Sequence, residues 1–364
     1  SGGAARAGEP GAVDSLSRMA GVEKMKSPRG AELFEVRRRP AEGFHWDYYL
    51  LVPKGWGRGG HQGNSSGTGD ENGPGSSAEL SSYLLLAPNN TGTNSDDMAL
   101  HAERARELLR RVHRWLGREL GTPCLVPVFP RPRMIEGAPR EGWFYYTHAL
   151  DRQSLELEVE EYERIDRQLI AMIDHARSLL SKTGRRVEPE VLMFGFSASG
   201  NYANRFALLH PGRVRAVAAG GLNGMPLLPL DRMAGRRLYY PVGIYDVEEL
   251  TGDTVDLDAV RRTPQYLFMG ELDANDTLPY DDAFDDRERR IIEEVFATVP
   301  VREPSEEKAS ILLERFELSK ELYLRMEIPA RFEVYEGIGH TLNGEVVADI
   351  IEFYEESVEV EAEE

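Results

Sequence analysis

Short apolar runs that lack polar alternation constrain the fold of this chain more than any other sequence feature. A strand buried on both faces has no polar side to alternate with, so such runs are typical of parallel sheets covered by helices. Segments with apolar residues at helical spacing separate many of them, which is the pattern of α/β proteins. The predicted strands are 83–88, 124–129, 191–196, 214–221, 264–270 and 330–337, and the predicted helices are 96–120, 160–184, 285–297, 305–326 and 344–356, with one more opening near residue 200.

A single domain accounts for all of these elements. Two more predicted strands, 32–39 and 46–53, open the sheet. We therefore expect one α/β domain over 32–358, with a mostly parallel central sheet and helices on both faces. The small and polar residues of 1–31 predict a flexible N-terminal tail, and 359–364 a short acidic C-terminal tail.

Two stretches depart from the alternation of strands and helices. Residues 55–80 are rich in Gly, Ser and Asn and cannot bury enough apolar surface to fold alone, so they predict a flexible loop. Residues 222–263 separate two strands with little periodicity, and we expect a lid-like insertion there. Such an insertion would lie over the carboxyl ends of the strands, where open α/β sheets bind their ligands.

Charge and cysteine content exclude several classes of function. The formal net charge of -19 disfavours a nucleic-acid backbone or an anionic membrane as partner. Cys124 is the only cysteine, which excludes an intramolecular disulfide and a structural zinc site built on thiolates. No apolar run approaches the ~18 residues that span a bilayer. We expect no nucleic-acid partner and no membrane span, and the composition leaves the oligomeric state open.

The N-terminal residues bear on the cellular compartment. They lack an initiating Met and an apolar leader segment, which fits either a trimmed chain or a mature one from which a signal has been removed. Together with the Gly/Ser-rich loop, this favours an extracytoplasmic location slightly over a cytoplasmic one.

The stretch GFSASG, residues 195–200, follows a predicted strand and opens a predicted helix. A nucleophile on such a sharp turn needs small residues two positions before and after it, because a larger side chain would collide with the neighbouring backbone. Ser197 has Gly195 and Ser199 at these positions, whereas Ser199 is followed two residues later by Asn201. Of the two serines the stretch favours Ser197 as a nucleophile, and a plain tight turn is the alternative.

With these residues the chain resembles the α/β-hydrolase fold family, whose catalytic residues follow the chain order Ser, acid, His. His340 fits the last position, because it follows the strand 330–337 within the Gly-rich stretch GIGHTLNGE. The resemblance implies that His340 is the general base and that Asp273, three residues beyond Gly270 at the end of a strand, orients it. Asp276 lies in the same loop and is a rival for the role of the acid.

The resemblance also implies an oxyanion hole of two backbone N–H groups. One is that of Ala198, directly after the nucleophile, and the other comes from the loop after the strand 83–88, where we expect Asn90 to supply it. Side chains near these positions are expected to contact substrate, namely Asn89, Thr91, Phe196 and Tyr146.

The reaction implied is hydrolysis of a carboxylic ester through an acyl-enzyme intermediate. The expected partner is a small-molecule or polymeric ester, including polyester-type and feruloyl-type substrates, and we expect no cofactor and no metal. Two alternatives remain open from the residues alone. One is a serine peptidase or amidase on the same fold, and the other is a catalytically silent binding module.

Overall fold

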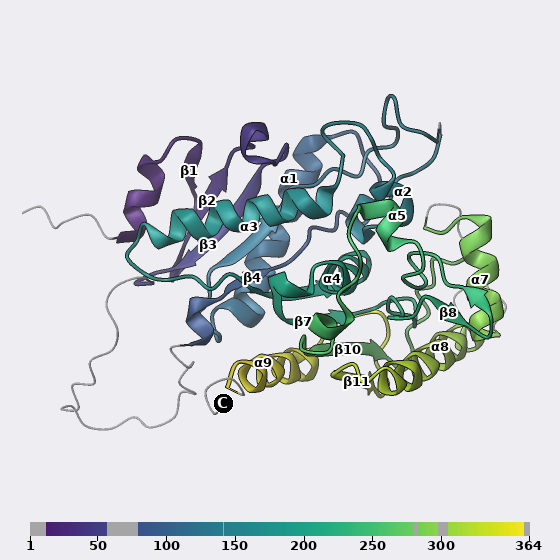
Figure 1. The fold of residues 1–364 in the computed structure, drawn as a ribbon. Coiled ribbons are helices and arrows are strands. Elements are labelled where there is room, and N and C mark those ends of the chain that lie inside the picture. The colour runs from purple at the N-terminus through teal and green to yellow at the C-terminus, as the bar shows by residue number, and fades with distance from the viewer. Residues whose placement is uncertain (1–11, 57–78, 141, 280–282, 298–304, 360–364) are drawn as a thin grey trace, which may run out of the picture.

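The computed structural model describes residues 12–56, 79–140, 142–279, 283–297 and 305–359. Its centre is a sheet of nine strands (Figure 1). In spatial order these are β1 (Val22–Met25), β2 (Ala31–Val36), β3 (Tyr48–Pro53), β5 (Cys124–Pro127), β4 (Leu84–Leu86), β6 (Val191–Phe196), β7 (Val214–Gly220), β10 (Gln265–Gly270) and β11 (Ala330–Tyr335).

The strand directions confirm a mostly parallel sheet. From β5 to β11 all neighbours are parallel, whereas β3 runs antiparallel to both β2 and β5, and β1 runs antiparallel to β2. Parallel neighbours require a crossover connection, and the intervening helices supply it. As a result, the carboxyl ends of β4, β6, β10 and β11 meet at one edge of the sheet.

Helices cover both faces, as the apolar runs predict. The long ones are α1 (Met98–Val112), α3 (Ile165–Ser181), α4 (Ala198–Leu209), α7 (Asp286–Phe296), α8 (Glu306–Arg325) and α9 (Gly344–Glu359), and shorter ones are α2 (Arg152–Leu155), α5 (Val247–Thr251) and α6 (Leu257–Val260). Apolar side chains of α3, α4 and α8 join one core cluster, and those of α1 and α9 join another. The two clusters lie on opposite faces, because Leu84 and Leu86 of β4 belong to the first and Leu85 to the second.

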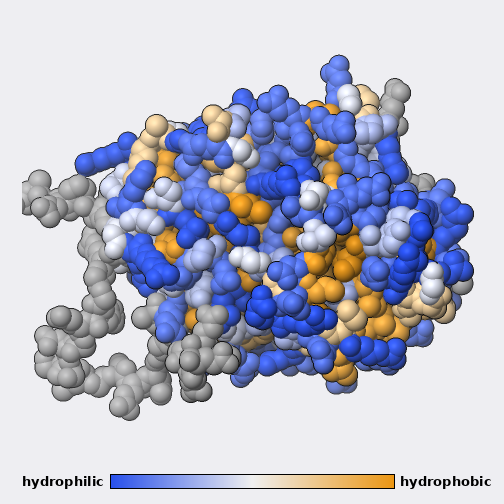
Figure 2. Space-filling model, viewed as in Figure 1, coloured by the Kyte–Doolittle hydropathy of each residue, from blue (hydrophilic) through white to orange (hydrophobic). Residues whose placement is uncertain are grey.

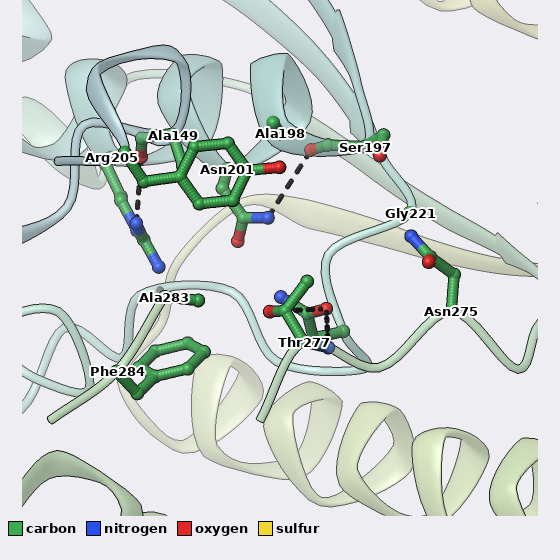
Figure 3. A pocket seen from close by; sticks show the side chains of 12 residues that line it. Ala149, Ser197, Ala198, Asn201, Arg205, Gly221, Asn275, Thr277, Ala283 and Phe284 are labelled. Atoms are coloured by element: carbon green, nitrogen blue, oxygen red, sulfur yellow. Dashed lines mark hydrogen bonds between the residues drawn. The ribbon is translucent and has the colours of Figure 1, made fainter. Parts of the chain in front are cut away.

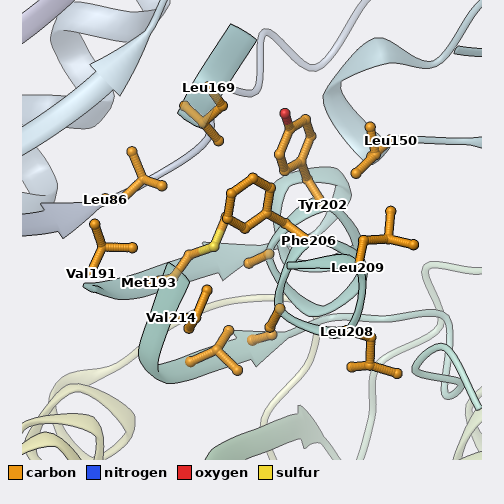
Figure 4. Close-up of a cluster of buried hydrophobic side chains, with 14 of the residues drawn as sticks. Leu86, Leu150, Leu169, Val191, Met193, Tyr202, Phe206, Leu208, Leu209 and Val214 are labelled. Atoms are coloured by element: carbon orange, nitrogen blue, oxygen red, sulfur yellow. The ribbon is translucent and has the colours of Figure 1, made fainter. Parts of the chain in front are cut away.

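Helix α4 is buried along its whole length. Figure 4 shows Tyr202 and Phe206 of this helix packed toward Met193 of β6 and Leu169 of α3. Burying an aromatic or aliphatic side chain of this size contributes roughly 1.5–3 kcal/mol. The helix that follows Ser197 is thus held rigidly against the centre of the sheet.

The N-terminal boundary differs from the prediction. The expected flexible tail over 1–31 is wrong from residue 12 onward, since Ala12–Arg18 forms a 3-10 helix and β1 extends the sheet. Val13, Leu16 and Val22 are buried in the main core, so a few apolar side chains anchor a segment of otherwise mainly small and polar residues. Residues 1–11 lie outside the described residues. Of the expected acidic tail, Glu359 is the last residue of α9, and 360–364 lie outside the described residues.

The two irregular stretches have different outcomes. Within 55–80, the expected flexible loop, residues 57–78 lie outside the described residues, and the flanking Trp56 and Leu80 are buried. The stretch 222–263 contains α5, α6 and the ribbon of β8 (Arg232–Met233) and β9 (Arg236–Arg237). It buries Leu238 and Tyr240 in the same core as the sheet.

The surface agrees with the composition. Figure 2 shows a face that is mainly hydrophilic, with separate hydrophobic patches. In the part of the chain that the structure describes, no helix is both long enough and apolar enough to cross a membrane.

A buried carboxyl group at the start of α7 predicts a pH-dependent stability. Glu288 completes a capping box with Asp285 and is fully buried, and this burial raises the pKa of Glu288 from 4.5 to about 8. The folded protein therefore holds this proton more tightly than the unfolded chain does, so the stabilisation is present below about pH 4.5 and is lost as the pH rises toward 8.

We expect Glu288→Gln to remove this loss. Between about pH 5 and pH 8, the free energy of unfolding of the parent chain should fall relative to that of the variant by on the order of 3 kcal/mol. Urea titrations at both pH values measure this difference. Glu294→Gln, on the exposed face of the same helix, is the control and should leave the pH dependence as it is. Parallel pH profiles for the parent and Glu288→Gln would contradict the expectation.

Candidate active site

Ser197 lies on a sharp turn between β6 and α4. Its backbone has φ 63° and ψ −130°, a conformation that residues other than glycine rarely adopt. The turn depends on its small neighbours, because a Cβ on Gly195 would overlap the carbonyl of Ser199, and one on Gly200 would overlap that of Gly220. The strand, turn and helix form the setting that the predicted nucleophile position requires.

Ser199, the rival serine, is engaged elsewhere. Its hydroxyl donates to the carbonyl of Phe196 at 2.9 Å and accepts from the N–H of Phe196 at 3.1 Å, and its residue is 4% exposed. It braces the turn. Ser197 lines two pockets.

His340 and Asp273 form a hydrogen-bonded pair. The loops after β11 and β10 bring them together, with 2.8 Å between Nδ1 of His340 and Oδ2 of Asp273. Asp273 is 2% exposed, and its other carboxylate oxygen accepts from the backbone N–H of Asn275 at 2.9 Å. An ionised carboxylate only accepts, so the imidazole places its proton on Nδ1 and leaves a lone pair on Nε2. This is the tautomer that a general base needs.

Asn275 contacts that lone pair. Its side-chain nitrogen lies 3.1 Å from Nε2 of His340, and the described residues include no hydrogen bond between His340 and Ser197. Sequence reasoning did not anticipate this contact. For His340 to take a proton from Ser197, the side-chain amide of Asn275 has to move away from Nε2 of His340.

Gly221, directly after β7, lies between His340 and Ser197. A Cβ at this position would lie 2.7 Å from Cε1 of His340 and 3.2 Å from the backbone nitrogen of Ser197. The same residue has φ +65°, which favours glycine. The absence of a side chain here is what lets the imidazole approach the turn.

We expect Gly221→Ala to displace the imidazole. Shifts of about 1 Å in a reacting group can cost on the order of 10²-fold in rate, and if His340 activates Ser197 we expect a loss of that size in the activity that depends on Ser197. Gly235→Ala is the matched control, because Gly235 has φ +79° but no atom within 4 Å of the added Cβ. Both variants should lose thermal stability because of the positive φ, and only Gly221→Ala should lose activity. Full activity in Gly221→Ala would contradict this reading of the site.

Asp276, the rival acid, forms an ion pair with another residue. It is 2% exposed, and its Oδ2 lies 3.0 Å from Nη1 of the fully buried Arg315 on α8. Its Oδ1 accepts from the N–H of Leu278 at 3.0 Å. The structure thus brings Asp273, and not Asp276, to His340.

The predicted oxyanion donors lie on either side of Ser197. The N–H of Ala198 is the first of α4, so it belongs to the N–H groups that find no partner inside the helix. Asn90 follows β4, lines a pocket together with Ser197, and accepts from the N–H of Gly92 through its side chain at 3.0 Å. The positive end of the α4 dipole favours negative charge at the Ala198 N–H.

The side chains of Asn89 and Thr91, which the sequence predicts to contact substrate, point into the protein. Asn89 donates to the carbonyl of Phe129 at 2.8 Å and contacts Nε2 of His148 at 3.2 Å. Thr91 bonds Nδ1 of His101 through its hydroxyl at 2.6 Å and Nδ1 of His148 through its N–H at 3.3 Å. Burial lowers the pKa of His148 to about 3, so this imidazole is neutral and acts as a fixed hydrogen-bonding partner. These contacts hold the loop after β4 in shape.

Two pockets open from Ser197 in different directions. The first has a polar part formed by Asn201, Arg205, Asn223, Asn275 and Thr277, and it also includes Tyr146 (Figure 3). The second has polar residues such as Asn90 and Arg111 in its wall, and its apolar part is formed by Leu108, Trp115, Phe194, Phe196 and Leu342. Phe196 also packs against the ring of His340, with 4.7 Å between the centroids. The predicted contact residues Tyr146 and Phe196 therefore line different pockets.

The polar wall of the first pocket has little signature in the sequence. Asn201 and Arg205 lie inside a helix recognised by its apolar residues, and Asn223 and Thr277 lie in loops of mixed composition. An Asn or Thr in a loop is most often a turn residue, so only the fold shows that these side chains converge. Within the described residues, no cluster of three or more His, Cys, Asp or Glu side chains could hold a metal ion.

Comparison with known proteins gives structural neighbours but no family match. No protein-family model and no curated protein matches the chain. Among solved structures, poly(aspartic acid) hydrolase-1 from Sphingomonas sp. KT-1 is 14% identical with a TM-score of 0.47, covering 93% of this chain and 97% of that chain. A poly(3-hydroxybutyrate) depolymerase from Bordetella parapertussis is 14% identical with a TM-score of 0.47, covering 94% and 92%. An S-formylglutathione hydrolase from Agrobacterium tumefaciens is 14% identical with a TM-score of 0.44, covering 94% and 98%.

The assignment of the fold comes from the sheet itself. Beyond the edge strand β1, the spatial order is β2, β3, β5, β4, β6, β7, β10, β11, and β3 alone runs antiparallel to both of its neighbours within this set. Ser197 follows the strand in the middle of the parallel part, and β10 and β11 follow it in both chain and space. This order, with a strand, a strained turn and a helix at its centre, defines the fold that the sequence resembles. The chain has the α/β-hydrolase fold.

Proposed function

We propose that this chain is a serine hydrolase of carboxylic esters, in which Ser197 is the nucleophile, His340 the general base and Asp273 the residue that orients it. The single observation that carries the proposal is the buried Asp273–His340 hydrogen bond beside the strained turn of Ser197. A buried carboxylate that fixes the tautomer of a half-buried histidine next to a serine is the arrangement that activates a hydroxyl.

The reaction proceeds in two halves. Nε2 of His340 takes the proton of the Ser197 hydroxyl as its oxygen attacks the ester carbonyl, and the imidazolium then gives that proton to the departing alcohol. Water, deprotonated by the same nitrogen, attacks the acyl-enzyme and releases the acid and free Ser197. The charge on the carbonyl oxygen is stabilised by the N–H of Ala198 and by a donor from the loop at Asn90, each worth about 3 kcal/mol in comparable enzymes.

Asn275 gives the site a closed resting state. Because its amide contacts Nε2 of His340 at 3.1 Å, it keeps the base in the required tautomer but occupies the position of the Ser197 proton. Binding of substrate in the first pocket, which Asn275 lines, would displace the amide.

The test is a comparison of matched substrates. We expect hydrolysis of 4-nitrophenyl butyrate with saturation kinetics, and much slower cleavage of the corresponding 4-nitroanilide, in which the leaving group is an amine. Faster cleavage of the anilide would assign a peptidase or amidase. Failure to cleave any ester, in protein shown to be folded by circular dichroism, would contradict the proposal and favour a silent binding module.

A further inference from the structure

Arg205 is a buried cation without a matching anion. It lies on α4, is 4% exposed, and donates from Nη1 to the carbonyl of Ala149 at 2.8 Å. The described residues provide no ion-pair partner for it. Two other buried arginines have a carboxylate partner: Arg152 has Asp246 at 2.5 Å, and Arg315 has Asp276 at 3.0 Å. Burial lowers the pKa of Arg205 but a guanidinium stays charged at neutral pH, so its charge needs an explanation.

The nearest acids do not supply the missing anion. Asp151 influences Arg205, yet its carboxylate caps α2, where it accepts from the N–H and hydroxyl of Ser154 and from the N–H of Tyr146. Glu288 has a pKa of about 8 because of its burial, so it is protonated at neutral pH. Asp151 attracts the Arg205 guanidinium but makes no direct ion pair with it. A buried charge without a direct partner is costly, and a bound anion would remove that cost.

The guanidinium faces the pocket that contains the nucleophile. Arg205, Ser197 and Asn201 line the same pocket, and Figure 3 shows the Arg205 guanidinium and the Asn201 amide pointing into its open part. A guanidinium has five N–H donors, and among the described residues Arg205 makes one hydrogen bond, to the carbonyl of Ala149. The described residues provide no partner for its other donors, which a ligand in the pocket would supply.

The spacing along α4 limits the size of that ligand. Arg205 lies eight residues after Ser197, so its Cα is about 12 Å farther along the helix axis. Side chains on a helix tilt toward its N-terminus, which brings the guanidinium back toward Ser197. A group bound there would be separated from the scissile carbonyl by a short chain of a few carbon atoms.

We propose that Arg205 is the anchor of a carboxylate subsite, and that the preferred substrates are esters carrying a carboxylate a few bonds from the scissile carbonyl. This inference rests on the proposed function. Arginine suits the role because its planar fork matches a carboxylate with two parallel hydrogen bonds. Since the chain has a net charge of -19, an anionic substrate gains nothing from long-range attraction, and its recognition depends on this local cation.

The experiment compares carboxylate esters with neutral isosteres. One pair places the charge on the acyl side, as monoethyl glutarate against ethyl glutaramate. The other places it on the alcohol side, as the acetate ester of γ-hydroxybutyrate against that of its primary amide. In at least one pair we expect kcat/KM to be roughly 10–100-fold higher for the carboxylate, the effect of a charge-assisted hydrogen bond, and the pair that responds identifies the side.

Variants assign the preference to Arg205. In Arg205→Gln the carboxylate-to-carboxamide ratio should fall to about one, and Arg205→Lys should restore part of it. Arg213→Gln removes the same charge just after α4, where Arg213 pairs with Asp174 away from the pocket, and should keep the full ratio. A parent ratio of one or less in both pairs, or an unchanged ratio in folded Arg205→Gln, would overturn the proposal.

Two further measurements separate the outcomes. If Arg205→Gln does not fold, inhibition of the parent enzyme tests the subsite instead. Glutarate should inhibit ester hydrolysis and glutaramide should not. Equal inhibition by the two compounds would overturn the subsite. If the parent cleaves no ester, the proposed function fails, and titration calorimetry of Ser197→Ala with glutarate tests the subsite by itself. Binding of glutarate without binding of glutaramide supports the subsite, and no binding overturns it.

Discussion

Ser197→Ala should lower kcat for ester hydrolysis by on the order of 10⁵-fold while leaving the fold unchanged. Removing the nucleophile of a serine hydrolase leaves only binding and oxyanion stabilisation, which explains both the large loss and the small residual rate. Alanine occupies the same backbone conformation as serine, so the strain at φ 63° is the same in both proteins. Initial rates on 4-nitrophenyl butyrate and a thermal melt measure the two effects.

Ser199→Ala is the matched control for this prediction. Ser199 bonds both the N–H and the carbonyl of Phe196, so its loss should loosen the turn and cost about 1 kcal/mol of stability. We expect a rate within about tenfold of the parent. If Ser199→Ala were the inactive variant and Ser197→Ala the active one, the nucleophile would be Ser199, and the account of the turn would be wrong.

Asp273→Asn should lower kcat by on the order of 10³–10⁴-fold. Asparagine can donate to Nδ1 of His340, which would move the imidazole proton to Nε2 and remove the lone pair that accepts the Ser197 proton. Thermal stability should change little, because the amide fills the same space. The pH–rate profile of the residual activity is the additional readout.

Asp276→Asn separates the two acids. This change removes the ion pair between Asp276 and the buried Arg315, so we expect a loss of about 3 kcal/mol in the free energy of unfolding. Below the melting temperature, kcat should stay within about tenfold of the parent. Urea titrations and ester assays on both variants give the comparison, and a large loss of kcat in Asp276→Asn alone would exchange the roles of the two residues.

The parts of the fold that could be predicted are those with a strong local signal. Apolar strands such as 191–196 and amphipathic helices such as 344–356 repeat over enough residues to be read from the chain, and both occur in the structure. The segment 12–30 could not be predicted, because β1 has only a few residues and gains its stability from pairing with β2. Such an edge strand depends on a partner that is not visible locally.

The candidate site also has a part that the sequence predicts and a part that only the fold reveals. The small residues around Ser197 and the Gly-rich stretch around His340 are local, so the sequence identifies both positions, and the structure brings Asp273 to His340. The contact of Asn275 with His340 and the pocket position of Arg205 depend on how separate loops and helices meet. A short run of residues contains no record of such contacts.

The most direct measurement of the central claim, an activated Ser197, is labelling with a fluorophosphonate probe followed by mapping of the modified peptide. It needs no knowledge of the natural substrate. We expect one adduct on the peptide that contains Ser197. It should be absent in Ser197→Ala and form far more slowly in His340→Ala. No adduct in folded protein, or an adduct that persists in Ser197→Ala, would contradict it.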